Sequence, residues 1–161
     1  MKTSDLKNMA VVSLGDGTRI GRIEDILFDT GALHVAALVV ATAGGRSILP
    51  VAAVRSIGSD AVTVESGAAV QASAPSSSNN LLRGLKDLSG AKVVNAEGTY
   101  LGEVHEIEID PTSRALTGLD VRRGGVLGLG GTSVVVPAAA IRSIGPDLIT
   151  AEVSAAATEG G

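Results

Sequence analysis

Residues 93–111 read VVNAEGTYLGEVHEIEIDP, and this stretch decides the fold. Runs of aliphatic and β-branched residues alternate with Asn, Gly, Asp and Pro, which favour turns. The pattern predicts a strand over residues 92–95, a tight turn at Glu97 and Gly98, and a long strand over residues 100–109. A small sheet protein is therefore expected.

The whole chain repeats this pattern. A shift of 81 residues places the first half on the second, and the shift becomes 87 after an insertion in the second copy. Over residues 48–65, ten of eighteen positions are then identical to residues 135–152. Since two copies are too few for a solenoid, each copy should close its own core. Identical pairs in the first part include Ala10/Ala91, Val12/Val93, Gly17/Gly98, Gly21/Gly102, Ile26/Ile107 and Asp29/Asp110.

Residue spacing in the long strand predicts a β-bulge in each copy. Ile23 and Ile26 are three residues apart instead of two, so the strand has to accommodate one extra residue. We expect bulges at residues 24–25 and, from the same spacing in the second copy, at residues 105–106. Such a bulge bends the strand so that it can serve two sides of a barrel.

The predicted fold class is all-β, with two tandem, strongly bent antiparallel β-barrels of five or six strands each. The later strands of the second copy are expected at residues 116–122, 133–136, 141–144 and 148–152. One helical turn is expected at residues 138–140, directly after Pro137, which has no N–H for a ladder.

Composition shifts set the predicted domain boundaries. The two repeats are expected at residues 1–70 and 81–153, joined by a flexible Ser/Asn-rich linker at residues 71–80. A disordered tail is expected at residues 154–161. Residues 81–88, LLRGLKDL, are expected to form a short turn that plugs one end of the second barrel.

Composition also narrows the classes of function. The chain has 161 residues, a net charge of −4, no cysteine, and Tyr100 and Phe28 as its only aromatic residues. A slightly acidic chain with so few rings lacks the features of nucleic-acid binding, so no nucleic-acid partner is expected. The lack of cysteine fits a cytoplasmic location. The most apolar window, residues 35–43, is too short for a transmembrane segment.

Four segments of the second copy resemble the PRC-barrel family. This family includes the cytoplasmic domain of the photosynthetic reaction-centre H subunit and the C-terminal domain of the ribosome maturation factor RimM. The resemblance implies a small β-barrel used as a protein-binding or assembly module, without catalytic residues shared across the family. The segments are residues 93–111, 116–121 (LTGLDV), 125–131 (GVLGLGG) and 134–137 (VVVP).

The resulting hypothesis is a non-catalytic adaptor of the bacterial cytoplasm that binds a protein partner or a second copy of itself, with no cofactor and no metal. Two alternatives stay open: a ribosome-associated or RNA-processing assembly factor, by analogy with RimM, and a small-molecule or metal-sensing domain. His34 and His105 do not occupy matching positions in the two copies, and no GxSxG motif is present. No catalytic residue is therefore assigned.

An apolar strand face in the first copy is one candidate protein contact. Val35, Ala37, Val39 and Ala41 lie on the face opposite to Leu38 and its neighbours, whereas the second copy is partly polar there. Because an apolar outward face is usually covered, Val35, Ala37 and Val39 are expected to bury against the other barrel or a second chain.

The glycine-rich loop is the other candidate contact. Its Val126, Leu127 and Leu129 are apolar and are expected to be exposed. The loop leads into a strand and lacks the Gly-Lys-Ser/Thr motif of a phosphate-binding loop, so a connecting loop is the favoured interpretation.

Two further motifs are interpreted as structural. The acidic stretch at residues 103–110 could form a weak cation site, but its spacing matches no known metal motif, and a solvated strand face is favoured. The sequence RSIG occurs at residues 55–58 and 142–145 and is expected to form a strand and turn whose arginines point outward.

Overall fold

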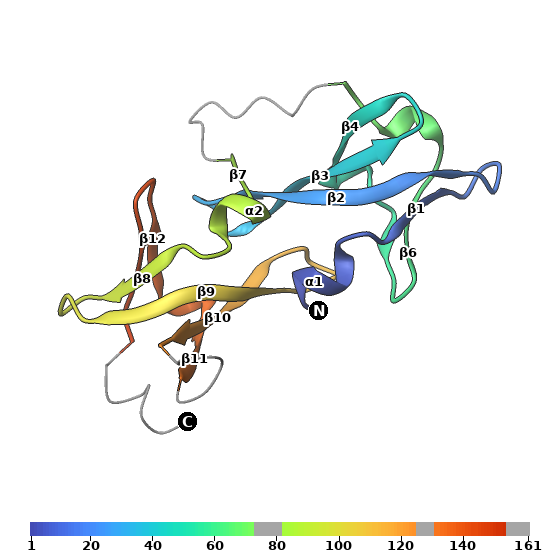
Figure 1. Cartoon of the computed structure of the whole chain (residues 1–161). Coiled ribbons are helices and arrows are strands. Elements are labelled where there is room, and N and C mark those ends of the chain that lie inside the picture. Colours follow the sequence, from blue (N-terminus) through green and yellow to red (C-terminus); the bar gives the residue numbers. More distant parts are fainter. Residues whose placement is uncertain (73–81, 125–130, 154–161) are drawn as a thin grey trace. The chain divides into compact units, whose positions relative to one another are not determined.

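The computed structural model describes residues 1–72, 82–124 and 131–153, and these residues form two separate sheets (Figure 1). The all-β fold class with two tandem sheet domains is therefore confirmed. None of the described helices is long and apolar enough to span a membrane.

The chain divides into two compact units that do not follow the sequence repeats at every point. Unit 1 comprises Met1–Leu85 and Ile109–Ala115, and unit 2 comprises Lys86–Glu108 and Leu116–Gly161. Two short segments of the second sequence copy thus belong to unit 1.

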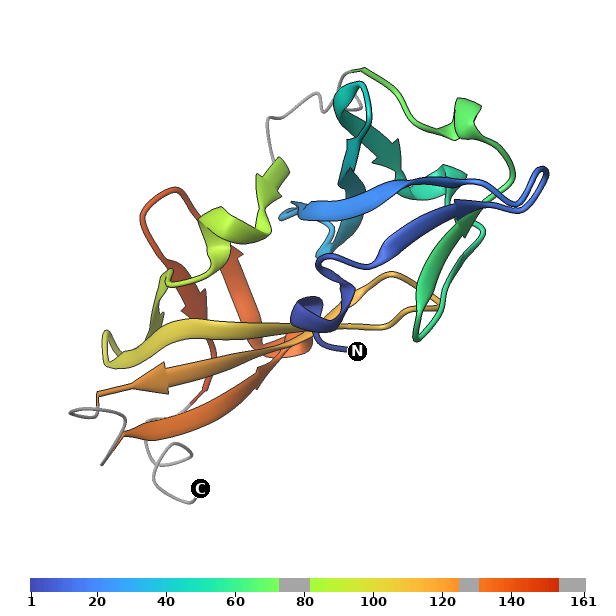
Figure 2. The same ribbon diagram turned by 45° about the vertical axis from the view of Figure 1, so that its right-hand side comes forward.

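The elements of unit 1 are α1 (Thr3–Leu6), β1 (Ala10–Ser13), β2 (Arg19–Asp29), β3 (His34–Thr42), β4 (Gly45–Pro50), η1 (Val51–Ala53), β5 (Ser56–Ile57), β6 (Ala61–Val64), η2 (Gly67–Ala69) and β7 (Leu82–Gly84). The strand order is β4-β3-β2-β1-β6-β5, and β7 pairs with β2 as well. β3 and β4 turn away from the direction of β1 and β2, so the sheet is bent (Figure 2).

The next elements are α2 (Leu85–Leu88), β8 (Lys92–Asn95), β9 (Tyr100–Ile109), β10 (Leu116–Arg123), β11 (Thr132–Pro137), η3 (Ala138–Ala140), β12 (Ile141–Ile144) and β13 (Ile149–Ala151). The order of the second sheet is β11-β10-β9-β8-β13-β12, which repeats the path of the first. The predictions for β8, β9, η3 and β12 are confirmed to the residue.

The prediction of wholly antiparallel sheets was wrong. β1 pairs with β6 in parallel, and β8 pairs with β13 in parallel. In each sheet the first strand of the repeat (β1 or β8) lies next to its last strand (β6 or β13), and the two strands run in the same direction. This pairing joins the two ends of each repeat through backbone hydrogen bonds.

The register of the sheets also corrects the alignment of the repeats at their start. Val11 faces Gly21, and Val93 faces Gly102, so β1 and β8 are related by a shift of 82 residues. The shift of 81 begins only after the following turn, which is one residue longer in the first copy. The predicted match of Val12 with Val93 is therefore displaced by one residue.

The bulge predicted at residues 24–25 is confirmed in β2. Ile23 and Asp25 face consecutive residues of β3, so Glu24 is the extra residue. Because of this insertion, Ile23 and Ile26 are both fully buried although they are three residues apart.

A side-chain carboxylate caps the backbone next to this bulge. Asp25 is only 4% exposed, and its Oδ1 accepts a hydrogen bond of 2.9 Å from the backbone N–H of Ile26. In β9, Glu106 Oε1 accepts a bond of 3.2 Å from the N–H of Ile107. These residues match Asp25 and Ile26, so the two copies use the same device at the same place.

We expect Asp25→Ala to destabilise unit 1 by about 1–3 kcal/mol, because the buried N–H of Ile26 loses its acceptor. Urea unfolding of the full chain measures the loss. Asp25→Asn keeps an acceptor oxygen and should recover much of it, and Glu106→Ala should cost less because Glu106 is more exposed. A midpoint for Asp25→Ala equal to that of the original chain would contradict the role of this carboxylate.

The expectation that residues 81–88 form a turn that plugs the second barrel is wrong for β7. The helical turn α2 does follow at Leu85–Leu88, and Leu88 is buried in unit 2. β7 extends the sheet of unit 1, where Gly84, Arg83 and Leu82 face Leu27, Phe28 and Asp29 of β2. β1 pairs only with the first half of β2 and leaves the edge of its second half free for another strand.

The segment Ile109–Ala115 completes unit 1. The N–H of Ile109 donates to the carbonyl of Met1 at 2.8 Å. The N–H of Val35 donates to the carbonyl of Arg114 at 2.9 Å. The guanidinium of Arg114 donates to the carbonyl of Val54 at 3.1 Å.

The buried side chains are almost all aliphatic, as the composition predicts. Phe28 is the one aromatic ring among the fully buried described residues, at 1% exposure. Its equivalent position in the second copy is Ile109, which also belongs to unit 1. The largest buried side chains include Leu6, Ile23, Ile26, Phe28, Leu38 and Leu49 in unit 1, and Leu88, Ile107, Leu119 and Ile149 in unit 2.

Candidate functional site

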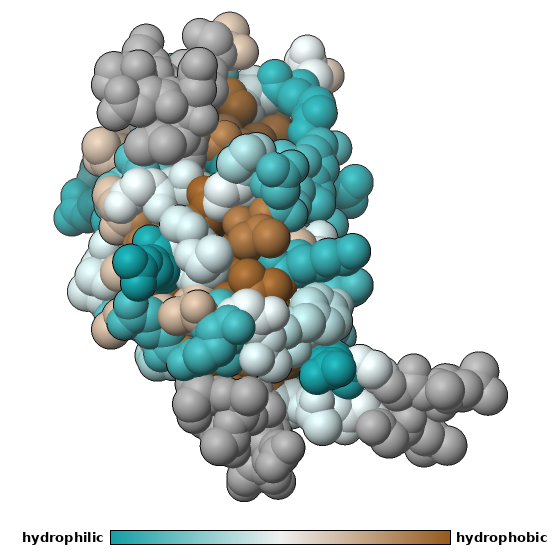
Figure 3. Space-filling model, turned by 90° about the vertical axis from the view of Figure 1, so that its left-hand side faces the viewer, coloured by the Kyte–Doolittle hydropathy of each residue, from teal (hydrophilic) through white to brown (hydrophobic). Residues whose placement is uncertain are grey.

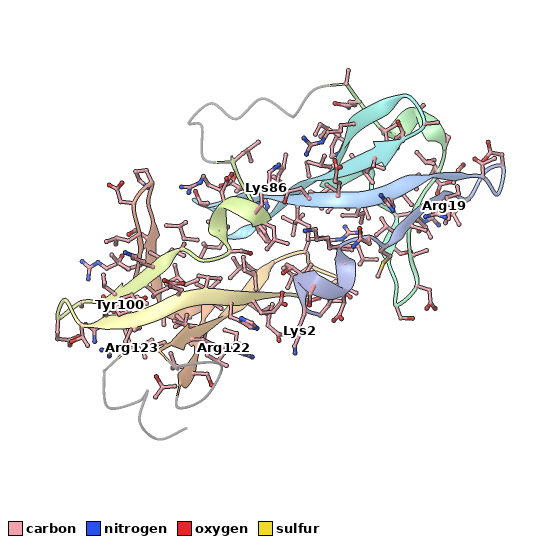
Figure 4. All side chains as sticks on the ribbon, viewed as in Figure 1. Lys2, Arg19, Lys86, Tyr100, Arg122 and Arg123 are labelled. Carbon is pink, nitrogen blue, oxygen red and sulfur yellow. The ribbon has the colours of Figure 1, made fainter. Side chains whose placement is uncertain are left out.

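A polar pocket lies on unit 2, where the first half of β9 meets the end of β10. Its volume is about 280 Å³. The lining residues are Tyr100, Glu103, Val104, His105, Arg122 and Gly124. Tyr100, Arg122 and Arg123 lie close together at this end of β9 (Figure 4). We call Tyr100, Glu103, His105, Arg122 and Arg123 the Tyr100 surface.

The turn before β9 fixes the position of Tyr100. Asn95 is 3% exposed, and its Oδ1 accepts hydrogen bonds from the N–H groups of Glu97 at 3.1 Å and Thr99 at 2.8 Å. This is the usual way in which an Asn side chain stabilises a tight turn. Tyr100 follows directly and is therefore held by a buried anchor.

Gly102 allows a close approach between β9 and the end of β10. Its φ is +136°, and a Cβ atom at this position would lie 2.4 Å from the carbonyl oxygen of Arg122. Only glycine permits both this conformation and this approach. Gly102 therefore allows Arg122 and Arg123 to sit beside Tyr100.

Arg123 stacks on Tyr100. Its guanidinium carbon lies 5.6 Å from the ring centroid, and its Nη1 donates to the carbonyl of Tyr100 at 3.4 Å. At an exposed site such a cation–π contact contributes about 0.5–1 kcal/mol. Partial burial raises the pKa of the Tyr100 phenol above its ordinary value, and the charge and hydrogen bond of Glu103 raise it further. The phenol therefore stays protonated at neutral pH and can donate a hydrogen bond.

The charges of the Tyr100 surface are mixed. Arg122 pairs with Asp120 at 3.3 Å, and its side chain is 56% exposed. Glu103 and His105 are exposed on β9. The surface thus offers cations, an anion and an aromatic ring within a small area, which suits a polar macromolecular contact better than a deep ligand cavity.

The first copy does not share these residues. Arg19, Arg22 and Glu24 stand where the second copy has Tyr100, Glu103 and His105, and Ala41 and Thr42 stand where it has Arg122 and Arg123. Arg19 occupies the matching end of β2 (Figure 4). Glu24 instead forms an ion pair of 2.6 Å with Arg46. The scaffold is common to both copies, whereas the Tyr100 surface belongs to the second one alone.

Sequence reasoning did not assign this surface. From the sequence, Glu103 and His105 belong to an acidic stretch interpreted as a solvated strand face, and Tyr100 is only one of two aromatic residues. The available signal was that the chain's one tyrosine replaces an arginine of the other copy at a position outside the core. Arg123 lies over the ring of Tyr100 only because β9 pairs with β10, and the sequence alone does not predict this pairing.

The apolar strand face predicted as a protein contact is buried. Val35 and Ala37 have no exposed surface and Val39 is 6% exposed. Leu38 and Val40, on the other face of β3, are also fully buried. The three side chains are therefore buried within the chain, as expected for a covered face. Val126, Leu127 and Leu129 lie outside the described residues.

The acidic stretch does not gather at one point. Asp110 Oδ1 accepts hydrogen bonds from the N–H groups of Thr112 at 2.8 Å and Ser113 at 3.2 Å, and these bonds lower the pKa of its carboxyl group. Asp110 belongs to unit 1, whereas Glu103 and His105 belong to unit 2. Among the described residues, no group of three His, Cys, Asp or Glu side chains could hold a metal ion.

The repeated RSIG motif is structural, as predicted. Arg55 forms an ion pair with Glu65, and Arg142 pairs with Glu152 at 2.8 Å. Each arginine thus bridges the last two strands of its repeat. Beside each ion pair, a serine and a threonine hydroxyl are hydrogen-bonded at 2.6 Å: Ser56 with Thr63, and Ser143 with Thr150. The same small network therefore occurs in both copies.

One face of the molecule is mixed in character. Polar side chains dominate this side of the molecule, and a few apolar side chains reach the surface between them (Figure 3). Such composition resembles that of transient protein interfaces more than that of a buried oligomer interface.

Comparison with known proteins matches this architecture. The family model for the PRC-barrel domain matches residues 1–71 and again residues 82–157. A search of curated proteins found no significant match. The two matched regions carry the two repeats and together cover most of the chain. The chain therefore belongs to the PRC-barrel family, with two PRC-barrel domains in tandem.

Proposed function

We propose that this chain is a non-catalytic adaptor of the cytoplasm that binds a partner protein through the Tyr100 surface. The observation that carries the proposal is the stack of Arg123 on Tyr100, present in one copy of the scaffold and absent from the other. Tyr and Arg are the residue types that most often dominate the energy of protein interfaces.

Pre-organisation supports this role. A bound tyrosine or arginine loses little side-chain freedom if it is already held in place. The turn anchored by Asn95 and the hydrogen bond from Arg123 to Tyr100 hold both side chains before any partner arrives.

Capture from a lysate of the native host tests the proposal. Tyr100→Ala/Arg123→Ala should reduce recovery of the main partner about tenfold or more, since truncating a hot-spot residue costs about 2 kcal/mol. Arg19→Ala/Thr42→Ala changes the matching positions of the first copy and should leave recovery unchanged. Quantitative mass spectrometry compares the three samples. Equal recovery of all partners by both variants would refute the role of this surface.

A further inference from the structure

The cations of the Tyr100 surface are not all balanced by carboxylates of the chain. Glu103 faces Lys92 across the β8–β9 pair, and Arg122 already has an aspartate partner at 3.3 Å. Arg123 contacts the ring and the carbonyl of Tyr100, and it forms no ion pair with a described carboxylate. The surface therefore carries a positive charge that the described part of the chain does not neutralise.

The first copy pairs its charges in the matching area within the chain. Its Glu24, from β2, forms an ion pair of 2.6 Å with Arg46, from β4. The matching residues of the second copy are His105 and Ser133, so both the carboxylate and its arginine are replaced. The second copy instead has two arginines at the end of β10, without the carboxylate that the first copy places beside them.

Hydrogen-bond donors line the pocket of the Tyr100 surface. The ion pair of Arg122 engages its Nη2 alone, which leaves other N–H groups of the guanidinium for a further acceptor. The hydroxyl of Tyr100 donates to Glu103 over 3.5 Å, a long bond that a closer acceptor would replace. Because a guanidinium binds a carboxylate through two parallel N–H groups, a carboxylate suits these donors well.

The volume of the pocket and the charge of the chain narrow the source of this carboxylate. The volume of about 280 Å³ lies just below the range of about 300–1,000 Å³ that is usual for small-molecule sites, and it suits a single side chain. A net charge of −4 and so few aromatic rings disfavour the phosphate backbone of a nucleic acid. An aspartate or glutamate of a partner protein is the occupant that these properties favour.

We infer that the partner protein presents an acidic side chain to this pocket, where Arg122 binds its carboxylate and the hydroxyl of Tyr100 donates a further hydrogen bond. The inference rests on the proposed function and adds the chemistry of the partner to it. Arg123 stays on the ring of Tyr100 and supplies the positive charge that attracts the carboxylate. Removal of one member of such a charged pair from an interface costs a large part of the affinity.

An NMR titration of the full chain with hexaglutamate, blocked at both ends, tests this chemistry. The side-chain N–H signal of Arg122 should shift and saturate at a peptide concentration at least about fivefold lower than that of Arg22. Arg22 is also exposed but belongs to the copy without the pocket. Equal responses of the two arginines would indicate unspecific attraction and would overturn the inference. Tighter binding of oligothymidylate than of hexaglutamate would also overturn it, because the site would then prefer phosphate.

The variant His105→Glu places within the second copy the carboxylate that the first copy has. Ala41 of β3 faces Arg46 of β4, and Arg122 stands at the position of Ala41, so a glutamate at position 105 would reach Arg122. This internal carboxylate should weaken hexaglutamate binding about tenfold. The control Thr117→Glu adds the same charge at an exposed position of β10 outside the Tyr100 surface and should bind within about twofold of the original.

A second variant keeps the test independent of the fold of His105→Glu. Arg122→Gln removes the guanidinium and adds no carboxylate, and it should weaken hexaglutamate binding by about tenfold as well. Binding by Arg122→Gln equal to that of the original chain would overturn the inference, and so would equal binding by His105→Glu and Thr117→Glu.

The outcomes also separate this inference from the proposed function. Suppose that Tyr100→Ala/Arg123→Ala loses the partner in the capture experiment, while the original chain shows no saturable response to millimolar hexaglutamate. The binding role of the Tyr100 surface would then stand, and the acidic partner side chain would be refuted. Capture by the double variant equal to that of the original chain would refute the proposed function and, with it, the inference.

Discussion

Replacing Gly102 by alanine should unfold unit 2 or destabilise it by about 3 kcal/mol or more. A residue with a side chain at φ of +136° costs about 1–3 kcal/mol in backbone strain. The new Cβ would also lie 2.4 Å from the carbonyl oxygen and 2.7 Å from the carbonyl carbon of Arg122, so β9 and β10 would have to separate. Such overpacking adds about 1–3 kcal/mol.

Denaturant unfolding followed by the methyl NMR signals of each unit would measure this effect. Gly67→Ala is the control, because a Cβ there meets no atom within 4 Å. Gly21→Ala, the twin in β2, should damage unit 1 instead, since its Cβ would lie 2.1 Å from the carbonyl oxygen of Ala41. A Gly102→Ala chain with the original midpoint for unit 2 would contradict the close approach of β9 and β10.

Residues 1–72 on their own should not form a stable unit 1. This fragment contains the whole first sequence copy, but it lacks β7, which pairs with Leu27, Phe28 and Asp29. It also lacks the segment Ile109–Ala115 with its bonds to Val35 and Val54. A domain of this size has only about 5 kcal/mol of stability to lose, and the missing contacts account for much of that.

Circular dichroism and proton–nitrogen NMR of the fragment would check this result. We expect poorly dispersed amide signals and no cooperative transition from the fragment, and dispersed signals with a cooperative transition from the full chain. Dispersed signals with the same unfolding midpoint that unit 1 shows in the full chain would contradict the assignment of residues 82–85 and 109–115 to this unit.

Local patterns in the sequence were sufficient for the strands and the first bulge. The bounds of β9 follow from Gly98 before it and Asp110 after it, and the bulge at residues 24–25 follows from the spacing of Ile23 and Ile26. Both features depend on residues that are close in sequence. Residues that favour turns end a strand, and the spacing of buried residues shows where the alternation between the two faces of the strand is interrupted.

The same local patterns do not predict which strands pair when they are far apart in the sequence. The parallel pairs β1–β6 and β8–β13 join segments some fifty residues apart, and nothing in their composition distinguishes a parallel from an antiparallel neighbour. β7 reads as part of a helical turn because Leu82 and Leu85 have near-helical spacing. It becomes a strand because the second half of β2 offers a free edge, which tertiary context alone reveals.

The candidate site was harder to predict than the fold for a related reason. Apolar residues are conspicuous in a sequence, and Val35, Ala37 and Val39 were chosen because they seemed to face outward. Both faces of β3 are buried within the chain, so these side chains are almost inaccessible to solvent. The Tyr100 surface is made of ordinary polar residues, and it becomes a surface only when Gly102 brings β10 next to β9.

The two copies of the scaffold differ in some residues and share others, and this difference separates structural residues from candidate binding residues. Features that hold the fold occur twice: a carboxylate that accepts a hydrogen bond from the next N–H, the ion pair near the last strands, and the close-approach glycine. Tyr100 and Arg123 occur once, at positions where the other copy has Arg19 and Thr42. The shared fold therefore does not require Tyr100 and Arg123 at these positions, which agrees with the proposed binding role.

Site-specific photo-crosslinking in the native host tests the central claim most directly. A benzophenone amino acid at Glu103 leaves Tyr100 and Arg123 in place, and the same amino acid at Arg22 marks the matching position of the first copy. We predict an adduct with one defined protein from position 103 and none from position 22. Equal adducts from both positions, or an adduct from position 22 alone, would contradict the proposal that the second copy carries the binding surface.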